Sequence, residues 1–559
     1  MRSSKLSRRY SSTLIARVSI AAPALAAALS CSLISTRASA TNVLEFPDNG
    51  SEQMGRGGAW IARASDPLAT YFNPAGLAGQ ETAITLQANV SFSHRCMTRV
   101  MAQNDTTNDP LIDRTTNLAY PKVCADISPF PNPQLGFTWR LSDRVGIGFL
   151  PLIGPSAVGK ANWPEFIDGR SPNQAAPQRY LLIDANLLLL TPTIGAGFEP
   201  IDGLRLGASF QWGIAGKVHF SNASIANNAD GLAPRENDVR AQIDAKQLFI
   251  PGFTLGGIWS ASDNIDLAGW YKWSAPVDAK GDVTTYFPYF TPAVANGNTS
   301  GVKVGDTSQP NCGISGSKET PCAAGDIGNV KVPIPMEAKI GVRYHQPRAG
   351  ATLRKHHRDP LSQDVFDIEL NLTWANNSVF ENVQLRFPGN ADGQGIIPVN
   401  GTPGTLPPTA DVPHKYKDVM GVRLGGDYNV IGDKLAIRAG AFFETRAQDP
   451  QYQNIDIAGA ERYGVALGGT YRIRMGAEKK SALELHAGYG HIFFATQSNT
   501  NPTSDGVHGL AGTQCNGGTP VANGTCSTGQ QQYRTNWPIN LGTITNAVNV
   551  INVGASYRF

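Results

Sequence analysis

The chain has 559 residues, of which only 16% are charged, and its formal net charge at pH 7 is +3. So small a charge for this length argues against a nucleic-acid partner. Outside the N-terminus no apolar run approaches the ~18 residues of a transmembrane helix, so membrane-spanning helices are not expected. In a soluble protein this length would mean several domains, but one large closed sheet can also absorb it.

The first forty residues, Met1 to Ala40, have the organisation of an export signal. A basic segment precedes the apolar run Val18 to Leu29, and Ala38-Ser39-Ala40 is a small-residue cleavage site. We predict cleavage before Thr41. The alternative is a lipoprotein processed at Cys31, but the three residues before that cysteine match the usual preceding triplet poorly.

The next segment, Met54 to Ala78, is rich in Gly and Ala yet shows neither a helical stripe nor strand alternation. Its residues favour tight turns, because Pro presets φ, Asn caps locally and Gly accepts positive φ. These turn signals are Gly55, Gly57, Gly58, Asp66-Pro67 and Asn73-Pro74-Ala75-Gly76. Such a segment packs compactly but builds no core of its own, so we expect it to lie against surrounding walls.

From residue 81 onward, apolar and polar residues alternate with period two, which predicts strands with one apolar face. The predicted strands are Glu81–Ser93, Gln134–Leu141, Val145–Phe149, Leu181–Phe198, Leu204–Trp212, Leu248–Ser260, Ile265–Trp273, Pro335–Tyr344, Asp364–Ala375, Tyr416–Tyr428, Leu435–Phe443, Tyr463–Ile473, Ser481–Phe494 and Thr543–Phe559. We therefore predict an all-β chain, an antiparallel barrel of about 14 strands, since single-chain bacterial barrels have an even number.

Short and long connections alternate between these strands, as in outer-membrane barrels with short periplasmic turns and long outside loops. One connection, Gln346 to Gln363, is too long for a periplasmic turn, and we interpret it as a solvated basic excursion. The six cysteines that follow the export signal fall in pairs, each within one predicted outside loop. The pairs are Cys96 with Cys124, Cys312 with Cys322, and Cys515 with Cys526.

We predict that these pairs are disulfides, because disulfides persist outside the cytoplasm. The alternative is unpaired loop thiols. Metal binding is not expected, because the chain has no CxxC motif with a nearby set of histidines.

A membrane barrel inverts the usual facing pattern, with apolar side chains outward and polar ones toward the lumen. In Asp364 to Ala375 this places Ile368 and Leu370 outside, with Asp367 and Glu369 inside. A soluble two-sheet protein would show the same alternation. Tryptophans near strand ends favour the membrane barrel, since they suggest interfacial girdles; they are Trp139, Trp212, Trp259, Trp273 and Trp374.

The last strand ends in Phe559, and Tyr557, Ala555, Val553 and Ile551 share its face. A terminal aromatic residue on an amphipathic last strand resembles the signal that the barrel-assembly machinery reads in outer-membrane barrels. We therefore predict that machinery as a partner, with outer-membrane lipid and lipopolysaccharide as the surroundings.

The export signal, Gly55-Arg56-Gly57, Asp66 and Asn73-Pro74-Ala75-Gly76, followed by the strand series, resemble the FadL/TodX family of outer-membrane transporters for fatty acids and hydrocarbons. The resemblance implies that residues 41–80 form a hatch inside a barrel of residues 81–559. It implies a passive diffusion channel for hydrophobic compounds in a Gram-negative outer membrane, with no cofactor and as a monomer. No GxSxG elbow or other nucleophile motif points to an enzyme.

The third predicted strand breaks its alternation at Leu150 to Pro155. Pro cannot donate to a ladder, and Gly with Pro indicates a bend or bulge. In the resembled family, an inward kink of the third strand opens a gap through which ligand leaves sideways. We predict such a kink here at Gly148, Pro151, Gly154 and Pro155. The alternative is a strand that simply ends near Leu150.

Two further sets of residues are candidates for ligand contact. The fourth outside loop contains Tyr286, Phe287, Tyr289 and Phe290, an unusually aromatic stretch that we predict captures ligand, or else packs on its neighbours as a lid. In the lumen, Arg423 and Arg438 are candidates to receive a carboxylate, with pairing to wall acids as the alternative.

Other functions fit a barrel as well. A general porin would lack an apolar pocket, and a structural or adhesive barrel would act through its outside loops alone. A TonB-dependent receptor is disfavoured, because only about forty residues precede the first strand. A single barrel strand already takes roughly 9–11 residues, so forty are too few for the plug of such a receptor.

Overall fold

The structure is a computed structural model that describes residues 48–103, 111–112, 115, 117–126, 129–154, 160–167, 174–225, 238–286, 302–303, 314–315, 318–319, 328–350, 359–386, 395–399, 402–406, 409–476, 478, 480–502, 506–510 and 534–559. Among these residues, no helix combines the length and the apolar character needed to cross a membrane.

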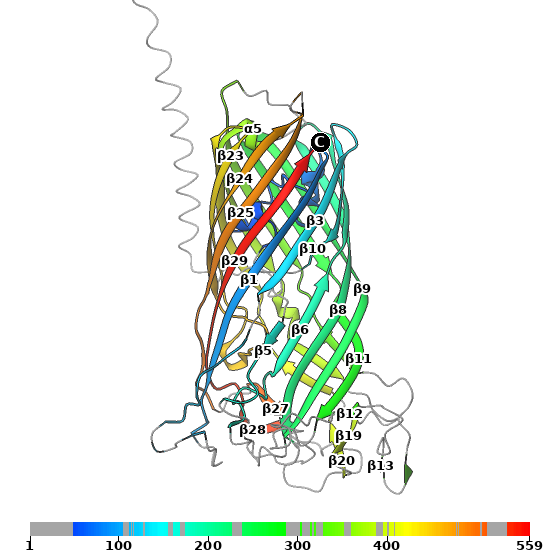
Figure 1. The fold of residues 1–559 in the computed structure, drawn as a ribbon, viewed down its shortest axis with the longest axis vertical. Helices are drawn as coiled ribbons and strands as arrows, with labels where there is room; N and C mark the ends of the chain where they lie inside the picture. The colour runs from blue at the N-terminus through cyan, green and yellow to red at the C-terminus, as the bar shows by residue number, and fades with distance from the viewer. Residues whose placement is uncertain are drawn as a thin grey trace, which may run out of the picture. The chain divides into compact units, whose positions relative to one another are not determined.

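Within the described residues, fourteen antiparallel strands pair in chain order and close into a barrel (Figure 1). The ring closes where β1 pairs with β29, from Ala83 opposite Arg558 to Arg99 opposite Gly542. The wall strands are β1 Ala83–Arg99, β3 Phe130–Arg140, β4 Val145–Leu152, β7 Thr193–Ile201, β8 Leu204–Ile225, β9 Asp238–Ser262, β10 Ile265–Ser274, β16 Glu337–Pro347, β17 Asp364–Ala375, β22 Val419–Ile431, β23 Leu435–Glu444, β24 Arg462–Met475, β25 Ser481–Phe494 and β29 Gly542–Arg558. The predicted fold class is confirmed.

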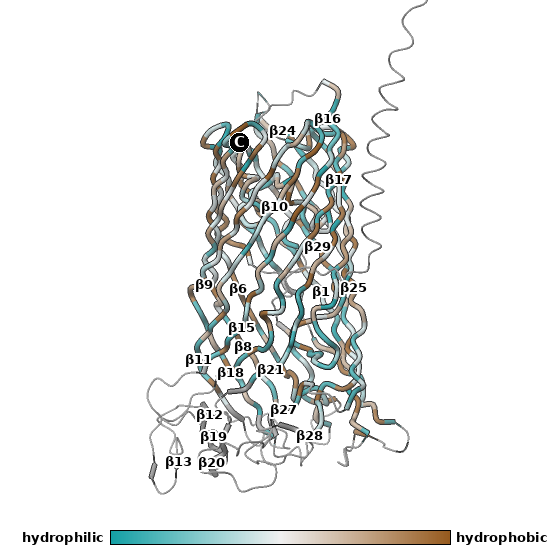
Figure 2. Tube along the Cα trace, turned by 180° about the vertical axis from the view of Figure 1, so that it is seen from behind, coloured by the Kyte–Doolittle hydropathy of each residue, from teal (hydrophilic) through white to brown (hydrophobic). Residues whose placement is uncertain are grey.

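The facing pattern is the inverted one. On β17, Ile368 and Leu372 are 51% and 48% exposed, whereas Glu369 and Asn371 are fully buried. The strands in Figure 2 alternate accordingly between teal and brown. On β29, Val553 is likewise exposed while its neighbour Asn552 is buried. Apolar side chains therefore surround a polar interior, as period two predicted.

The two ends of the barrel differ (Figure 1). Tight turns and the C-terminus lie at one end, and the longer connections lie at the other. The long connection at the turn end carries α5 Pro360–Gln363, and Asp359 at its start forms an ion pair with Arg472 of β24. The basic stretch 354–358 lies outside the described residues.

Shorter elements complete the fold. At the loop end, several of them extend the main sheet and enclose an apolar core that includes Val218, Ile243, Val283 and Leu385. The remaining elements are α2 Ser51–Gly55, α3 Ala69–Phe72, η1 Pro74–Leu77, β2 Val123–Cys124, β5 Lys160–Asn162, β6 Asp184–Leu190, β11 Val277–Tyr286, β12 Val302–Lys303, β13 Ile314–Ser315, β14 Lys318–Glu319, β15 Gly328–Val332, η4 Asn377–Val379, β18 Asn382–Arg386, β19 Gly395–Val399, β20 Thr402–Leu406, β21 Thr409–Pro413, η5 Pro450–Tyr452, β26 Gln497–Asn499, β27 His508–Leu510 and β28 Arg534–Pro538.

Several boundaries differ from the prediction: β8 runs on to Ile225 and β9 begins at Asp238, so both are longer than the predicted Leu204–Trp212 and Leu248–Ser260, and most other strand ends differ by a few residues. The strand expected over Leu181–Phe198 is divided into β6 and β7, because Pro192 has no N–H to give to a ladder. β1 runs to Arg99, so Cys96 lies on a wall strand and not in a loop. Its predicted partner is correct: Cys96 and Cys124 form a disulfide between directly opposed residues of β1 and β2. The cysteines at 312, 322, 515 and 526 lie outside the described residues.

Candidate functional site

The N-terminal segment, defined here as Asp48 to Gln80, lies within the ring of strands, where its blue ribbon is visible in Figure 1. Its α2 contacts the wall at β23, β24, β25 and β29, and its η1 contacts β4, β7, β8 and β9. It brings its own apolar side chains, Trp60, Leu68, Tyr71 and Leu77, into one core with wall residues. The turn signals in the sequence therefore belong to a compact segment enclosed by the barrel.

Glycines in the wall make room for this segment. A Cβ on Gly207 would lie 2.2 Å from the carbonyl carbon of Pro74, and one on Gly440 would lie 2.0 Å from that of Arg56. Real Cβ contacts are not this short, so the backbone of the segment sits directly on bare wall backbone. The same holds at Gly146, Gly197 and Gly425. Gly148 also faces the segment, since a Cβ there would lie 2.0 Å from Thr70 Oγ1.

Ion pairs also join the segment to β17 and β22 of the wall. Arg56 is fully buried and lies 2.6 Å from Asp367 and 2.7 Å from Asp427. Arg63 lies 2.5 Å from Asp367 and 3.2 Å from Asp427. Buried charges are tolerated when they are paired and hydrogen-bonded, and two arginines here share two carboxylates. Each carboxylate also pairs with a third arginine, Asp367 with Arg343 at 2.9 Å and Asp427 with Arg438 at 3.2 Å.

The Asn73-Pro74-Ala75-Gly76 turn is held by the Asn73 side chain. Its Oδ1 accepts from Ala75 N at 3.2 Å, and its Nδ2 donates to Ile61 O at 2.9 Å. Pro74 begins η1, where the missing N–H costs nothing. Asp66 is buried and accepts from Leu68 N at 2.8 Å. Burial, together with the nearby carboxylate of Glu52, raises the pKa of Asp66 to about 7.

The third wall strand has two parts with an interruption between them. β4 pairs with β7 as far as Leu150 opposite Thr193, and β5 pairs with β6 over Lys160–Asn162. On the other side, the ladder between β4 and β3 shifts register between Leu135 and Phe137. Pro155 lies outside the described residues.

At the interruption, Ile153 breaks the facing pattern of β4. By alternation it would point outward like Phe149, which is 38% exposed. Instead Ile153 is fully buried in the core that includes Trp60, Leu68 and Leu77 of the N-terminal segment. The backbone O of Gly154 accepts from the side chain of Asn49 at 2.7 Å. The side chain therefore turns inward after Leu152, while Ile153 O still accepts from Thr191 N of the neighbouring wall segment at 2.7 Å.

The strands beside the interruption keep an edge without a strand partner among the described residues. β6 pairs with β8 over its whole length, but on its other edge only Asp184–Asn186 pair, with β5. Residues 187–190 are four consecutive leucines, and Leu188 is 40% exposed. The wall at this point is bordered by apolar side chains.

The two predicted lumen arginines both have acidic partners. Arg423 lies 2.7 Å from Glu444 and also pairs with Asp48 of the N-terminal segment. Arg438 lies 3.2 Å from Asp427. The structure thus places them in the wall network that we gave as the alternative to carboxylate binding.

An apolar cluster facing the lumen was missed from the sequence. It consists of Met54, Ala466, Ile492, Val548 and Val550, with Phe442 and Phe494 packed against it. The guanidinium carbon of Arg423 lies 5.1 Å from the centre of the Phe442 ring. The available signal was the loss of alternation at Ile492-Phe493-Phe494 and Val550-Ile551, where both faces of a strand are apolar.

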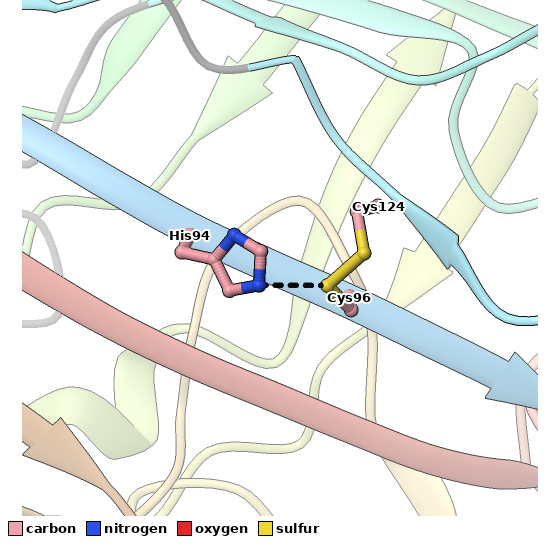
Figure 3. Close-up of side chains that lie close together, drawn as sticks. All are labelled: His94, Cys96 and Cys124. Atoms are coloured by element: carbon pink, nitrogen blue, oxygen red, sulfur yellow. Dashed lines mark hydrogen bonds between the residues drawn. A yellow bond between two sulfur atoms is a disulfide. The ribbon is translucent and has the colours of Figure 1, made fainter.

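The predicted capture residues Phe287, Tyr289 and Phe290 lie outside the described residues, and Tyr286 is the last residue of β11. On β1, the ring of His94 lies 3.2 Å from Cys96 Sγ, beside the disulfide (Figure 3). Because the two sulfur atoms are bonded to each other, neither is a thiolate that could bind a metal ion.

Solved structures share this architecture. A FadL homologue of Pseudomonas aeruginosa superposes with a TM-score of 0.61 at 17% identity, over 92% of this chain and 99% of its own. The toluene transporters TbuX of Ralstonia pickettii and TodX of Pseudomonas putida give TM-scores of 0.53 and 0.50 at 12% and 13% identity, each over 92% of this chain and 99% of theirs. Identities this low establish the fold alone.

A comparison with curated protein sequences gives no match. A family model does match: the outer membrane protein transport protein model, OMPP1/FadL/TodX, aligns with residues 195–523, more than half of the chain. This family consists of outer-membrane transport channels of Gram-negative bacteria. With the closed barrel and the enclosed N-terminal segment in view, the chain belongs to the OMPP1/FadL/TodX family of outer-membrane transport proteins.

Proposed function

We propose that this protein is a passive channel for hydrophobic compounds such as long-chain fatty acids or aromatic hydrocarbons. An apolar molecule gains little in a water-filled pore, whereas each CH₂ group that it buries contributes roughly 0.8 kcal/mol. A channel that offers apolar contacts and releases its ligand into the membrane needs no energy source, because the movement follows the concentration gradient.

In this proposal the N-terminal segment is a hatch. Its backbone rests on wall glycines such as Gly207 and Gly440, and its arginines reach carboxylates on β17 and β22. A segment fixed on opposite sides of a lumen obstructs straight passage. Ligand that enters from outside must then leave by another route.

That route is a side exit at the interruption of the third wall strand. The observation that carries the proposal is the burial of Ile153 in the core of the N-terminal segment, because it turns this side chain inward where the outward-facing pattern of the wall would otherwise continue. The bordering leucines of β6 offer apolar contacts at the point of exit. We propose that Gly148, Pro151, Gly154 and Pro155 belong to this bend.

Within the lumen, the apolar cluster around Phe442 and Ile492 is the proposed resting place of the ligand's hydrocarbon part. Its side chains are apolar on a face where most wall residues are polar, and Arg423 lies at its margin. A fatty acid or an aromatic hydrocarbon would place its apolar part against this cluster. The aromatic residues Tyr286, Phe287, Tyr289 and Phe290 are the proposed site of capture outside.

Uptake measurements separate the three candidate functions. Vesicles or cells that carry this protein as their only channel should take up a labelled fatty acid or toluene and should admit small sugars slowly. Rapid entry of sugars would instead indicate a general porin. Entry of neither class, with the barrel intact, would indicate a structural or adhesive barrel and would overturn the proposal.

The exit route has a test of its own. Leu188→Cys places a thiol at the edge of β6 that has no strand partner among the described residues, and Leu370→Cys places one on β17 at nearly equal exposure, 40% against 39% in the native residues. A bulky maleimide on Leu188→Cys should slow hydrophobic uptake, while the same reagent on Leu370→Cys and on the unsubstituted protein should not. Equal uptake by all three labelled proteins would refute the side exit.

We also propose that Met1 to Ala40 is removed on export, that the last strand is read by the barrel-assembly machinery, and that the mature chain lies in outer-membrane lipid as a monomer. A mature N-terminus at Thr41, determined by mass spectrometry of the purified protein, would support the first of these.

A further inference from the structure

The outward face of the sheet changes character where its strands continue past the apolar band toward the loop end. On β9, the lipid-facing side chains of Leu248 and Phe249 are 63% and 49% exposed. Two positions closer to the loops comes Lys246, which is exposed as well. A strand rises about 3.3 Å per residue, so Lys246 lies only about 7 Å along β9 from Leu248. This lysine therefore stands where the apolar band ends and lipid headgroups begin.

Exposed lysines on the neighbouring strands continue from this position. Lys280 of β11 lies directly opposite Lys246. Lys331 of β15 is a diagonal neighbour of Lys280, because Asn329, two positions earlier, is the residue opposite Lys280. Lys217 of β8 lies at the bulge that faces Lys246 from the other side. β8, β9 and β11 stand side by side at the loop end (Figure 1), and we call these four residues the lysine row.

The other face of the same strands is apolar. Each lysine of the row is next in sequence to a residue buried in the core at the loop end, and these residues are Val218, Ala245, Ala279 and Val330. Side chains alternate between the two faces of a strand. The lysine row therefore points away from the lumen, toward the surroundings of the barrel.

The lysines of the row repel one another. The Cβ atoms of directly opposed residues such as Lys246 and Lys280 are about 4.5–5.5 Å apart, and like charges at such positions destabilise a sheet. None of the four ammonium groups forms an ion pair with a described residue. An anion from outside the protein would relieve this repulsion.

The acids on this face already have partners. Asp244, which also attracts Lys217, accepts from His219 at 2.6 Å and from Gln242 at 2.7 Å. Asp278 accepts from the side-chain amide of Asn329. Asp282 lies opposite Asp244, on the loop side of the row. The positive charge of the row is therefore left open on the side of the apolar band.

Beside Lys331 the surface of the protein is hollowed. The hollow has a volume of about 370 Å³, and its lining includes Lys331, Ser378, Asn382 and Gln384. Its one acid, Glu381, pairs with Lys415 at 3.8 Å. Hollows of a few hundred Å³ with convergent polar groups are typical of small-molecule sites. Hydroxyl and amide groups are hydrogen-bond partners for sugars, so a row of cations next to this hollow fits a phosphate that is attached to a sugar.

We propose that the lysine row and the adjoining hollow bind the phosphorylated sugar headgroup of lipopolysaccharide. The loop end of such a barrel faces outside, so the row lies against the outer leaflet, which contains this lipid. A phosphate would lie between Lys246 and Lys280, and the sugar would lie against Gln384. The acyl chains would continue along the exposed Leu248 and Phe249. This inference does not depend on which compound the channel transports.

The test measures the binding of fluorescent lipopolysaccharide to the purified full-length protein in a nonionic detergent. Lys246→Gln combined with Lys280→Gln should weaken binding by roughly 30-fold, which corresponds to about 1 kcal/mol for each lysine. Lys434→Gln combined with Lys480→Gln removes the same charge from two exposed lysines at the turn end and should leave binding unchanged. Equal binding by the two double variants overturns the proposal.

A charge reversal separates binding from folding. Lys280→Glu places opposite charges on two directly opposed residues, so this variant should melt at the temperature of the unsubstituted protein or above it. It should nevertheless lose lipopolysaccharide binding. A variant that melts normally and still binds as tightly as the unsubstituted protein contradicts the assignment.

Three further probes identify the ligand. Lipopolysaccharide without its phosphates should bind the unsubstituted protein as weakly as intact lipopolysaccharide binds the Lys246 and Lys280 double variant. Gln384→Ala should weaken binding of lipopolysaccharide but not of phosphatidylglycerol, because only the former has a sugar to place in the hollow. If phosphatidylglycerol or inorganic pyrophosphate binds as tightly as lipopolysaccharide, and through the same lysines, the site is a general anion site and the proposal fails.

Discussion

The seat of the N-terminal segment on wall glycines gives the sharpest test of the closed state. In Gly207→Ala, the new Cβ would lie 2.2 Å from Pro74 C and 2.3 Å from Ala75 N. Carbon atoms in ordinary contact are about 3.5 to 4.0 Å apart, so the turn at Pro74 must move by at least about 1.3 Å. Both atoms are backbone atoms, so no side-chain rotation relieves the clash.

Overpacking of this kind costs roughly 1–3 kcal/mol. If the whole cost falls on the seated form of the segment, the ratio of seated to unseated molecules falls by roughly 5-fold to 150-fold. Conductance of single molecules in planar bilayers should report this as more frequent opening to small ions. The thermal midpoint of the variant should fall as well.

Gly257→Ala is the matched control. Gly257 lies on β9 opposite Leu206, one position from the pair of Gly207 with Gly256, and a Cβ there would be 3.8 Å from the nearest atom, Leu206 Cδ2. This variant should conduct like the unsubstituted protein. If Gly207→Ala also conducts and melts like the control, the segment is not held against the wall as described.

Three further predictions concern charge and facing. Arg56→Met leaves Asp367 and Asp427 with their other arginine partners but removes hydrogen bonds to both buried carboxylates, and it should lower stability in urea by about 1.5–3 kcal/mol, whereas Arg144→Met, which breaks an exposed pair with Asp202, should cost at most about 1 kcal/mol; similar losses would argue against a buried network. Because burial raises the pKa of Asp66 to about 7, the folded chain holds a proton that the unfolded chain releases, so stability should fall as pH rises from the ordinary value of 3.8 to about 7. Asp66→Asn should flatten that fall in thermal midpoints measured at pH 5 and pH 8, and an unchanged slope would contradict the assignment. Leu370→Arg should destabilise the barrel by up to about 2–4 kcal/mol on its outward face, seen as loss of the heat-modifiable band on gels, while Ser378→Arg outside the strands should not.

The strands could be predicted because every wall strand separates two unlike surroundings, and the period of two records that separation residue by residue. The ends of the strands, and the extra strands in the loops, were harder to predict from the sequence. Val277, Ala279 and Val283 alternate with Asp278, Lys280 and Asp282, yet they stand in a segment that we expected to be a loop. They form β11, which pairs with β9 and whose buried residues pack in the apolar core at the loop end together with residues of β8 and β9.

The partners of the lumen charges could not be predicted, because a barrel brings distant parts of the chain together. Asp48 and Arg423 are separated by 375 positions and nevertheless pair. Nothing in the neighbourhood of either residue in the sequence indicates the other. The Cys96–Cys124 pair could be predicted, because the two residues are only 28 positions apart and fall in one predicted connection.

The seam between β1 and β29 has a consequence for how the molecule is built. The enclosed segment comes directly before β1, and β29 is the last strand of the chain. Once β1 and β29 have paired, the N-terminal segment and its charged residues could reach their place only by passing through the interior of a closed barrel. During assembly the N-terminal segment therefore has to be in place before the barrel closes, and the pairing of β29 with β1 then encloses it.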